Sequence, residues 1–179
     1  MRIRVDEIPD LGRFLHLHWD QSQLSQFIPP DDPFEINLPH PVNVDLELNK
    51  FPDHIRIQGT LQGELQVNCH RCLTPVRLSL NEPIDLFLFS EEKAPQEDEI
   101  ELEAEDLDYS YFDGEVIDID LLIAEQIFLA LPFKVLCSEN CRGLCPGCGV
   151  NLNEEPCRCK KSKETPFSKL EEIKARLPG

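Results

Sequence analysis

Cysteine spacing is the feature that most restricts how this chain can fold. Six of the eight cysteines lie in residues 137–159, and the other two, Cys69 and Cys72, form a separate C-x-x-C pair. The N-terminal "MRIRVDEIPDLG" has charges and a proline where a secretory peptide needs an apolar run. No stretch approaches the roughly 18 apolar residues of a membrane span. We therefore expect a cytoplasmic protein, in which paired cysteines are more often metal ligands or redox centres than structural disulfides.

The first predicted metal site is contained in one short segment. Cys145 and Cys148 in "CPGCG" are two residues apart, and the glycines allow the backbone to fold around a metal ion. Cys157 and Cys159 follow closely, so four thiolates can surround zinc without help from the rest of the chain. Free or disulfide-bonded thiols are the weaker alternative in a reducing compartment.

The four remaining cysteines can share a second zinc ion. They are Cys69, Cys72, Cys137 and Cys141. A shared metal would join a turn of the predicted sheet to the segment that leaves a predicted helix, and would close a long loop of chain. The sequence leaves three alternatives open: one zinc in total with spare thiols, His70 in place of one sulfur, or a redox pair.

Four thiolates around one ion argue against catalysis. A catalytic zinc keeps an open coordination position, whereas four sulfurs fill the tetrahedron. The sequence has neither H-E-x-x-H nor the paired motifs of the zinc deaminases. "CPGC" also does not begin a helix, as a thioredoxin-like motif would. We therefore expect a protein that is not an enzyme, with a thiol oxidoreductase as the less favoured alternative.

Alternating apolar and polar residues predict a sheet. In residues 54–69 every odd position is apolar or glycine and every even position is polar, as in a half-buried strand. Because this strand is long, Gly59 or Gly63 is expected to mark a bend or bulge. Three further segments are predicted to be strands: 42–48, 76–80 and 84–89. Together they favour a twisted antiparallel sheet.

Two helices are expected after the sheet. Residues 118–131 carry apolar side chains too densely for a one-sided stripe, which predicts a buried helix that ends near Pro132. Apolar residues at helical spacing in "TPFSKLEEIKARL" predict a C-terminal helix at 164–179 that packs on the core. The expected α+β fold thus has a β-rich core at 1–136, a cysteine-rich zinc module at 137–163 and this last helix.

Charge is distributed unevenly along the chain. The net charge of −17 repels phosphate backbones and anionic membranes, so we expect no membrane partner and only local contact with nucleic acid. Residues 91–108 are predicted to form a solvated acidic loop, or else a docking surface for a basic ribosomal protein. Basic side chains gather only near the C-terminus, where the candidate RNA-binding residues are Arg158, Lys160, Lys161 and Lys163.

Three motifs in a fixed order resemble those of one family. They are "CHRCL" at 69–73, "IDIDLLIAEQIFLALP" at 117–132, and "CRGLCPGCGVNLN" at 141–153 followed by Cys157 and Cys159. Taken together they resemble the YceD family of bacteria and plastids, which is named for large ribosomal RNA subunit accumulation. The resemblance spans nearly the whole chain. Family members often carry Asp-Pro-Arg before an aromatic residue, where this chain has Thr165, Pro166 and Phe167.

The resemblance implies a non-enzymatic protein needed for normal levels of large-subunit ribosomal RNA. Its expected partners are that RNA or the assembly particles of the large subunit, and no small-molecule substrate is expected. The alternative is a protein-interaction or chaperone-like module that binds a basic ribosomal protein without touching RNA.

Overall fold

The computed structural model describes residues 1–30, 32, 35–91 and 109–159. The predicted acidic loop lies outside these residues except for Glu91, and so does the predicted C-terminal helix at 164–179. Lys160, Lys161 and Lys163 also lie outside them. No helix in the described part of the chain has the length and apolar character that crossing a membrane requires.

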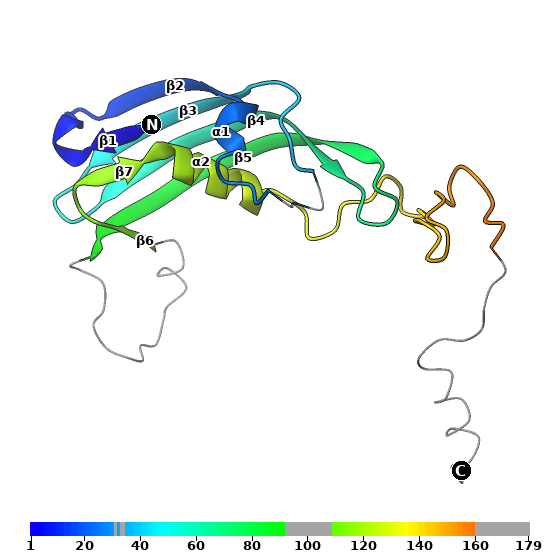
Figure 1. Cartoon of the computed structure of the whole chain (residues 1–179). Helices are drawn as coiled ribbons and strands as arrows, with labels where there is room; N and C mark the ends of the chain where they lie inside the picture. Colours follow the sequence, from blue (N-terminus) through cyan, green and yellow to red (C-terminus); the bar gives the residue numbers. More distant parts are fainter. Residues whose placement is uncertain (31, 33–34, 92–108, 160–179) are drawn as a thin grey trace, which may run out of the picture.

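A five-stranded sheet forms the centre of the molecule (Figure 1). Its strands, in spatial order, are β2 (Arg13–Trp19), β3 (Val42–Lys50), β4 (Ile55–Asn68), β5 (Pro75–Ser90) and β6 (Tyr109–Phe112). Neighbours from β2 to β5 are antiparallel, as predicted, but β6 is parallel to β5. A parallel neighbour needs a connection of about a dozen residues or more, which the segment 91–108 supplies. The sheet is therefore mixed, within the predicted α+β fold.

The strand β5 corrects the prediction of two short strands, because it runs through both 76–80 and 84–89. Pro83 lies between these segments. Since β6 pairs with residues 87–90 and no other described strand lies on that side of β5, the stretch around Pro83 is an edge of the sheet as far as the structure describes it. A residue without an N–H group is tolerated at such an edge, so the proline does not end the strand.

The two glycines of β4 do not mark a bulge. Pairing with β3 and β5 continues through Gly59 and Gly63 without an extra residue. A Cβ atom at Gly59 would lie 1.9 Å from the carbonyl oxygen of Asp45, and one at Gly63 would lie 2.5 Å from a methyl group of Val42. The glycines thus allow β4 to lie close to the neighbouring strand β3.

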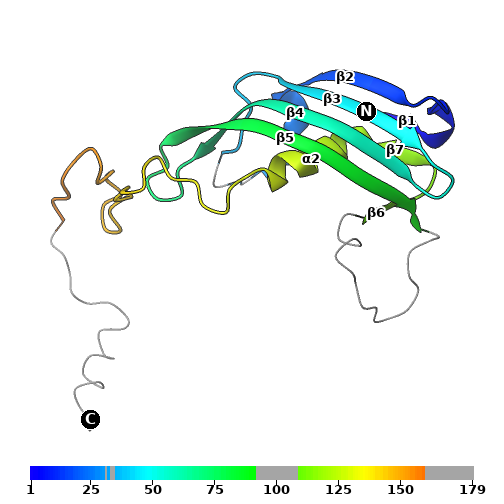
Figure 2. The ribbon, with the colours of Figure 1, turned by 180° about the vertical axis from the view of Figure 1, so that it is seen from behind.

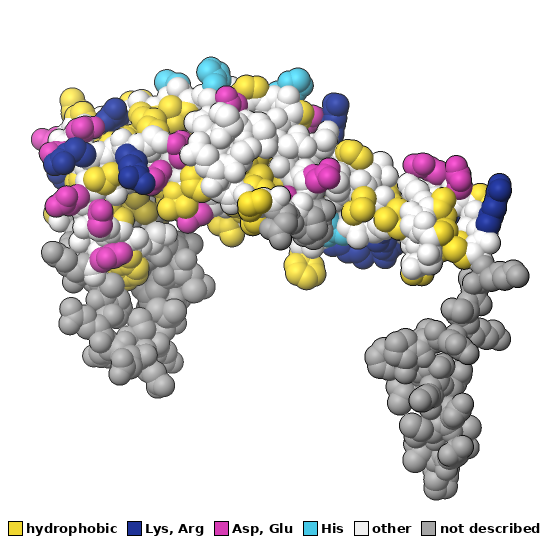
Figure 3. Space-filling view, viewed as in Figure 1, with side chains coloured by type: hydrophobic (Ala, Val, Ile, Leu, Met, Phe, Trp, Pro, Cys, Tyr) yellow, Lys and Arg dark blue, Asp and Glu magenta, His cyan; other side chains and the backbone are white. Residues whose placement is uncertain are grey.

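The sheet arches over the helix α2 (Ile119–Leu129), as both views show (Figures 1 and 2). Asp118 caps this helix by accepting a hydrogen bond from the Leu121 N–H group. The helix side chains buried against the sheet are Ile119, Ile123, Ala124 and Ile127. Leu129 is 76% exposed, so α2 is buried on one side and not all round as predicted. Apolar side chains therefore reach the surface beside α2 (Figure 3).

Short elements complete the structure around this sheet and helix. The strands β1 (Arg2–Arg4) and β7 (Val116–Asp118) form a second, antiparallel sheet next to α2. A 3-10 turn at Val5–Glu7 follows β1, and the helix α1 (Gln21–Leu24) follows β2. Because β7 leads directly into α2, this small sheet fixes where the helix begins.

Candidate metal centres

The first pair of thiols, Cys69 and Cys72, lies in the tight turn between β4 and β5. The Cys69 N–H group donates to the carbonyl of Thr74 over 2.9 Å, which closes the turn. The His70 N–H group donates to the carbonyl of Val135, also over 2.9 Å. This second bond brings the segment that follows α2 up to the turn, and that segment carries the next two cysteines.

Four thiols meet at this place, which we call the core site: Cys69, Cys72, Cys137 and Cys141. Their sulfur atoms all lie within 4.8 Å of one another. The Cys69–Cys141 and Cys72–Cys137 sulfur distances are 3.8 and 3.5 Å. A tetrahedral zinc ion with bonds of about 2.3 Å holds its sulfurs about 3.8 Å apart. The structure thus groups the two predicted pairs, and His70 is not one of the grouped ligands.

The other four thiols form a second group, the module site: Cys145, Cys148, Cys157 and Cys159. The sulfur of Cys157 lies 3.1 Å from that of Cys145 and 3.8 Å from that of Cys148. A Cβ atom at Gly147 would lie 3.3 Å from the Cys159 sulfur, so this glycine lets the chain fold tightly around the thiols. The module lies at the end of the molecule opposite β6 (Figure 1).

Both groups suit a metal ion of the zinc type. All eight cysteines are free, and each group offers four sulfurs that lie within 4.8 Å of one another. In the core site three of the four thiols are buried: Cys69, Cys72 and Cys141. Bound there, zinc would be held by these sulfurs and would supply a closed structural link. The two sites can each hold a metal ion, and its identity as zinc stays a prediction.

Backbone N–H groups prepare one thiol at each site for ionisation. Burial opposes ionisation of Cys69, but N–H groups, including those of Arg71 and Cys72, outweigh it and lower the pKa to about 6. At the module site a hydrogen bond from Cys157, together with N–H groups, lowers the pKa of Cys145 to about 6. Hydrogen bonds between thiols raise the pKa of Cys137 and Cys159 to about 12.

These pKa values predict that acid releases the metal. Binding requires thiolates, so the ion must displace protons from Cys137 and Cys159, and acid restores them. Below pH 6 protons also compete for Cys69 and Cys145, whose pKa values are about 6. We expect metal affinity to fall continuously from pH 8 to pH 5, and most steeply below pH 6. Chelator competition at a series of pH values measures this, and a flat profile would contradict thiolate ligation.

Asn153 connects the two sites. It lies in the chain between Cys148 and Cys157, yet its amide nitrogen donates to the Cys141 sulfur of the core site over 3.3 Å. Its amide oxygen accepts from the Arg142 N–H group over 2.8 Å. Folding of the module around its own thiols therefore places a hydrogen-bond donor on a sulfur of the core site. Such outer contacts orient metal ligands and tune the affinity of the metal.

Replacing Asn153 with alanine is expected to weaken metal binding at the core site by about 10- to 100-fold, the usual cost of losing an outer-shell partner. The module site keeps all four thiols and should bind as before. Stepwise metal titration against a chelator separates the two affinities. The variant Glu155→Ala is the control, because Glu155 is an exposed neighbour in the same loop. An equal loss at both sites would indicate general unfolding of the module instead.

The structure places only part of the predicted RNA-binding set. Arg158 is described and exposed, whereas the three lysines lie outside the described residues. Two supporting residues were not predicted from the sequence, Asn153 and Arg71. The Arg71 guanidinium donates to the carbonyl of Cys141 over 2.8 Å and holds the two halves of the core site together. Their only signal in the sequence is their position within the cysteine motifs.

Comparison with known proteins found relatives of this chain, three of which are described here. An uncharacterized protein of Mycobacterium leprae is 31% identical over 120 residues, which cover 65% of this chain and 51% of the relative. An uncharacterized protein of Mycobacterium tuberculosis is 29% identical over 136 residues, with 74% and 61% covered. The third, from Arabidopsis thaliana, is named large ribosomal RNA subunit accumulation protein YCED homolog 1, chloroplastic, and is 24% identical over 159 residues, with 76% and 50% covered.

The chain thus spans between 50% and 61% of the length of these relatives. No solved structure was found to match it. A family model described as large ribosomal RNA subunit accumulation protein YceD matches residues 57–174, a range that contains all eight cysteines. On this match, which covers more than half of the sequence, the chain belongs to the YceD family.

Proposed function

We propose that this protein is a non-enzymatic factor that supports the accumulation of large-subunit ribosomal RNA during biogenesis of the large ribosomal subunit. The observation that carries the proposal is the family match over residues 57–174. Relatives in Arabidopsis thaliana and Zea mays bear the name of that role. We propose the cytoplasm as its location, although these two plant relatives are named chloroplastic.

The metal sites support a structural role within this function. We propose one zinc ion at the core site and one at the module site, each held by four thiolates. Four sulfurs leave no open coordination position, so such ions stabilise the fold and do not activate a substrate. The four-sulfur grouping also disfavours a thiol oxidoreductase, which needs a pair of thiols that is free to form a disulfide.

Contact with RNA is assigned to the basic end of the chain. Residues 156–179 hold seven basic and three acidic side chains, against a net charge of −17 for the whole protein. We propose that phosphate groups of the large-subunit RNA bind there, through Arg158, Lys160, Lys161 and Lys163. Zinc at the module site would keep the start of this segment fixed to the core.

The test is sedimentation of the full-length, metal-loaded protein in native lysate. We expect it to migrate with large-subunit precursor particles, and RNase treatment should release it. Changing the four basic residues to glutamine should weaken the association, whereas Lys50→Gln with Lys134→Gln serves as a control for charge alone. Absence from large-subunit particles, with and without cross-linking, would contradict the proposal.

A second candidate function is a protein-interaction or chaperone-like module for a basic ribosomal protein. Residues 91–125 favour it, because they hold fifteen acidic residues and one basic residue. Association that survives RNase treatment and the four glutamine substitutions would support this candidate over RNA contact.

A further inference from the structure

A cluster of aromatic side chains lies on the outer face of the sheet, at the end far from the metal sites. We call it the aromatic patch: Phe51, His54, Phe87, Phe89 and Tyr111. We propose that this patch docks an arginine- or lysine-rich segment of a protein partner. The proposal gives the second candidate function above a binding surface, and it does not depend on contact with RNA.

Strand register places these rings on the solvent side of the sheet. The inner positions of β5 include the buried Leu88, whereas Phe87 and Phe89 alternate with it and face outward. Phe89 is paired with Tyr111 of the parallel neighbour β6, and the two rings lie 6.5 Å apart. Tyr111 is 44% exposed although it is a large aromatic residue, so the outer ends of β5 and β6 present rings to solvent.

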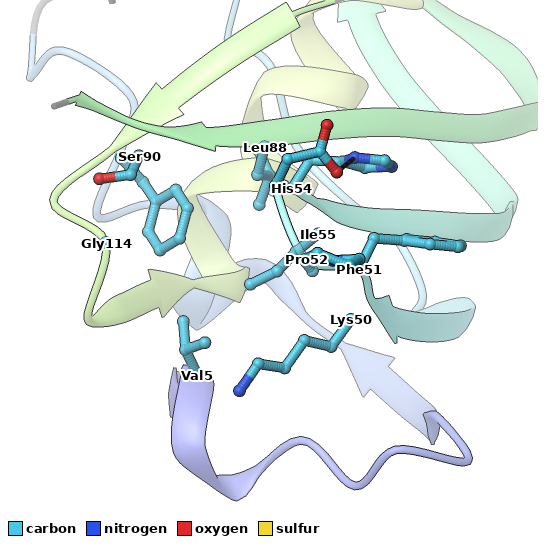
Figure 4. Close-up of a pocket in the computed structure, with 11 residues that line it drawn as sticks. Val5, Lys50, Phe51, Pro52, His54, Ile55, Leu88, Ser90 and Gly114 are labelled. Atoms are coloured by element: carbon cyan, nitrogen blue, oxygen red, sulfur yellow. Dashed lines mark hydrogen bonds and ion pairs between the residues drawn. The ribbon is translucent and has the colours of Figure 1, made fainter. Parts of the chain in front are cut away.

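The hairpin between β3 and β4 extends the patch. A hydrogen bond of 2.9 Å from the Phe51 N–H group to the His54 carbonyl closes the turn. The two rings stack at 4.7 Å with an angle of 14° between their planes, and the His54 ring lies 5.4 Å from that of Phe89. Figure 4 shows Phe51 and His54 pointing to the same side of the hairpin, away from Val5. Phe51 is 44% exposed, so the stacked pair continues the surface of Tyr111 and Phe89.

One arginine of the chain already binds in the proposed way at the border of the patch. The Arg56 guanidinium lies 5.0 Å from the centre of the Phe87 ring. It also donates two hydrogen bonds, of 2.8 and 2.7 Å, to the carboxylate of Asp85. A ring face and a carboxylate together are the two partners that a guanidinium group prefers. Phe51 and Tyr111, each 44% exposed, present ring faces of the same kind to cations from another molecule.

Acidic residues flank the exposed rings and decide the class of partner. Asp53 lies in the turn between Phe51 and His54, with its Oδ1 atom 2.8 Å from the Nδ1 atom of His54, and its side chain is 63% exposed. Glu91 follows β5 and is exposed. These two carboxylates repel the phosphate groups of a nucleic acid and attract a basic peptide, so the exposed rings are better suited to cations than to bases.

The experiment measures binding of a short fluorescent peptide of arginine, lysine and serine to the full-length, metal-loaded protein by anisotropy. The double variant Phe51→Ala, Tyr111→Ala removes two exposed rings that the peptide would contact through cation–π interactions. We expect it to bind the peptide about tenfold more weakly. The matched control is Phe14→Ala, because Phe14 is also exposed on the outer face but lies on β2, outside the patch. The double variant Phe51→Leu, Tyr111→Leu keeps apolar surface and should also lose affinity.

Three results would overturn the proposal. They are undiminished binding by the alanine double variant, an equal loss in Phe14→Ala, or tighter binding of a single-stranded RNA than of the peptide. Circular dichroism of each variant confirms that the sheet is intact. The result is separable from the ribosomal test, because a protein that binds the peptide but never sediments with large-subunit particles would retain this inference and lose the proposed function.

Discussion

Cys69→Ser is expected to remove one metal ion per chain and to lower the melting temperature of the sheet by about 10 °C. The Cys69 side chain is fully buried at the end of β4, and its sulfur lies 3.8 Å from that of Cys141. Without it, three thiolates remain and the turn loses its metal link to the segment after α2. A site filled at about 1,000 times its Kd contributes about 4 kcal/mol, which for a chain of this size is a shift on the order of 10 °C.

The matched variant is Cys145→Ser, which removes a ligand of the module site alone. It should also lose one metal ion, but the sheet should melt within a few degrees of the parent protein, because none of the four ligands of that site lies in a turn that joins two strands of the sheet. Elemental analysis counts the metal, and far-UV circular dichroism follows the sheet. If both variants melted equally early, the two sites would not have the separate structural roles that their positions indicate.

The sequence predicted the local features of the fold well. The alternation in residues 54–69 predicted β4 almost to its ends. Alternation depends only on which face of the strand is buried, so it can be recognised within one segment of the sequence. The helix α2 begins at Ile119, one residue inside the predicted start at residue 118. The module site was equally predictable, since its four cysteines lie close together in the chain and need no distant partner.

Features that depend on distant contacts were harder to predict. The strand β6 pairs parallel to β5, and β1 pairs with β7. These pairings depend on the path of the chain between the strands, and the sequence of a strand carries no periodic pattern that identifies its partner. The core site joins two cysteines of the turn between β4 and β5 to two cysteines that follow α2. Because these pairs lie far apart in the sequence, spacing alone could not exclude His70 as a ligand. Asn153 contacts a sulfur of a site outside its own loop, which explains why the motif did not reveal its role.

The aromatic patch was missed for a different physical reason. In residues 84–89 apolar side chains occupy both faces of the strand, a pattern typical of a strand covered on both sides. In the structure only the inner face, with Leu88, is covered by the core. Phe87 and Phe89 therefore lie on an outer face that the sequence indicates to be buried. This contradiction between pattern and burial is what makes the surface a candidate for a partner.

Trp19→Ala is expected to have the largest effect in the core, a loss of about 3 to 5 kcal/mol in the free energy of unfolding. The Trp19 side chain is 0% exposed at the end of β2, and its ring nitrogen donates to Asp120 over 3.0 Å. The substitution leaves a cavity under the sheet and removes the bond to the first turn of α2. Urea unfolding measures the loss, and both metal sites should still fill, since neither takes a ligand from β2.

The control for this substitution lies on the same strand but on the opposite face. Phe14 is 64% exposed, and four residues lie between it and Trp19, which places the two side chains on opposite faces of the strand. Phe14→Ala should therefore change the free energy of unfolding by less than about 0.5 kcal/mol. Trp19→Phe should fall between the two, because it keeps an aromatic ring in the core but loses part of the indole volume and the bond to Asp120. If Trp19→Ala were no more harmful than Phe14→Ala, the packing of α2 against the sheet would not be what stabilises the domain, and metal binding would have to account for most of its stability.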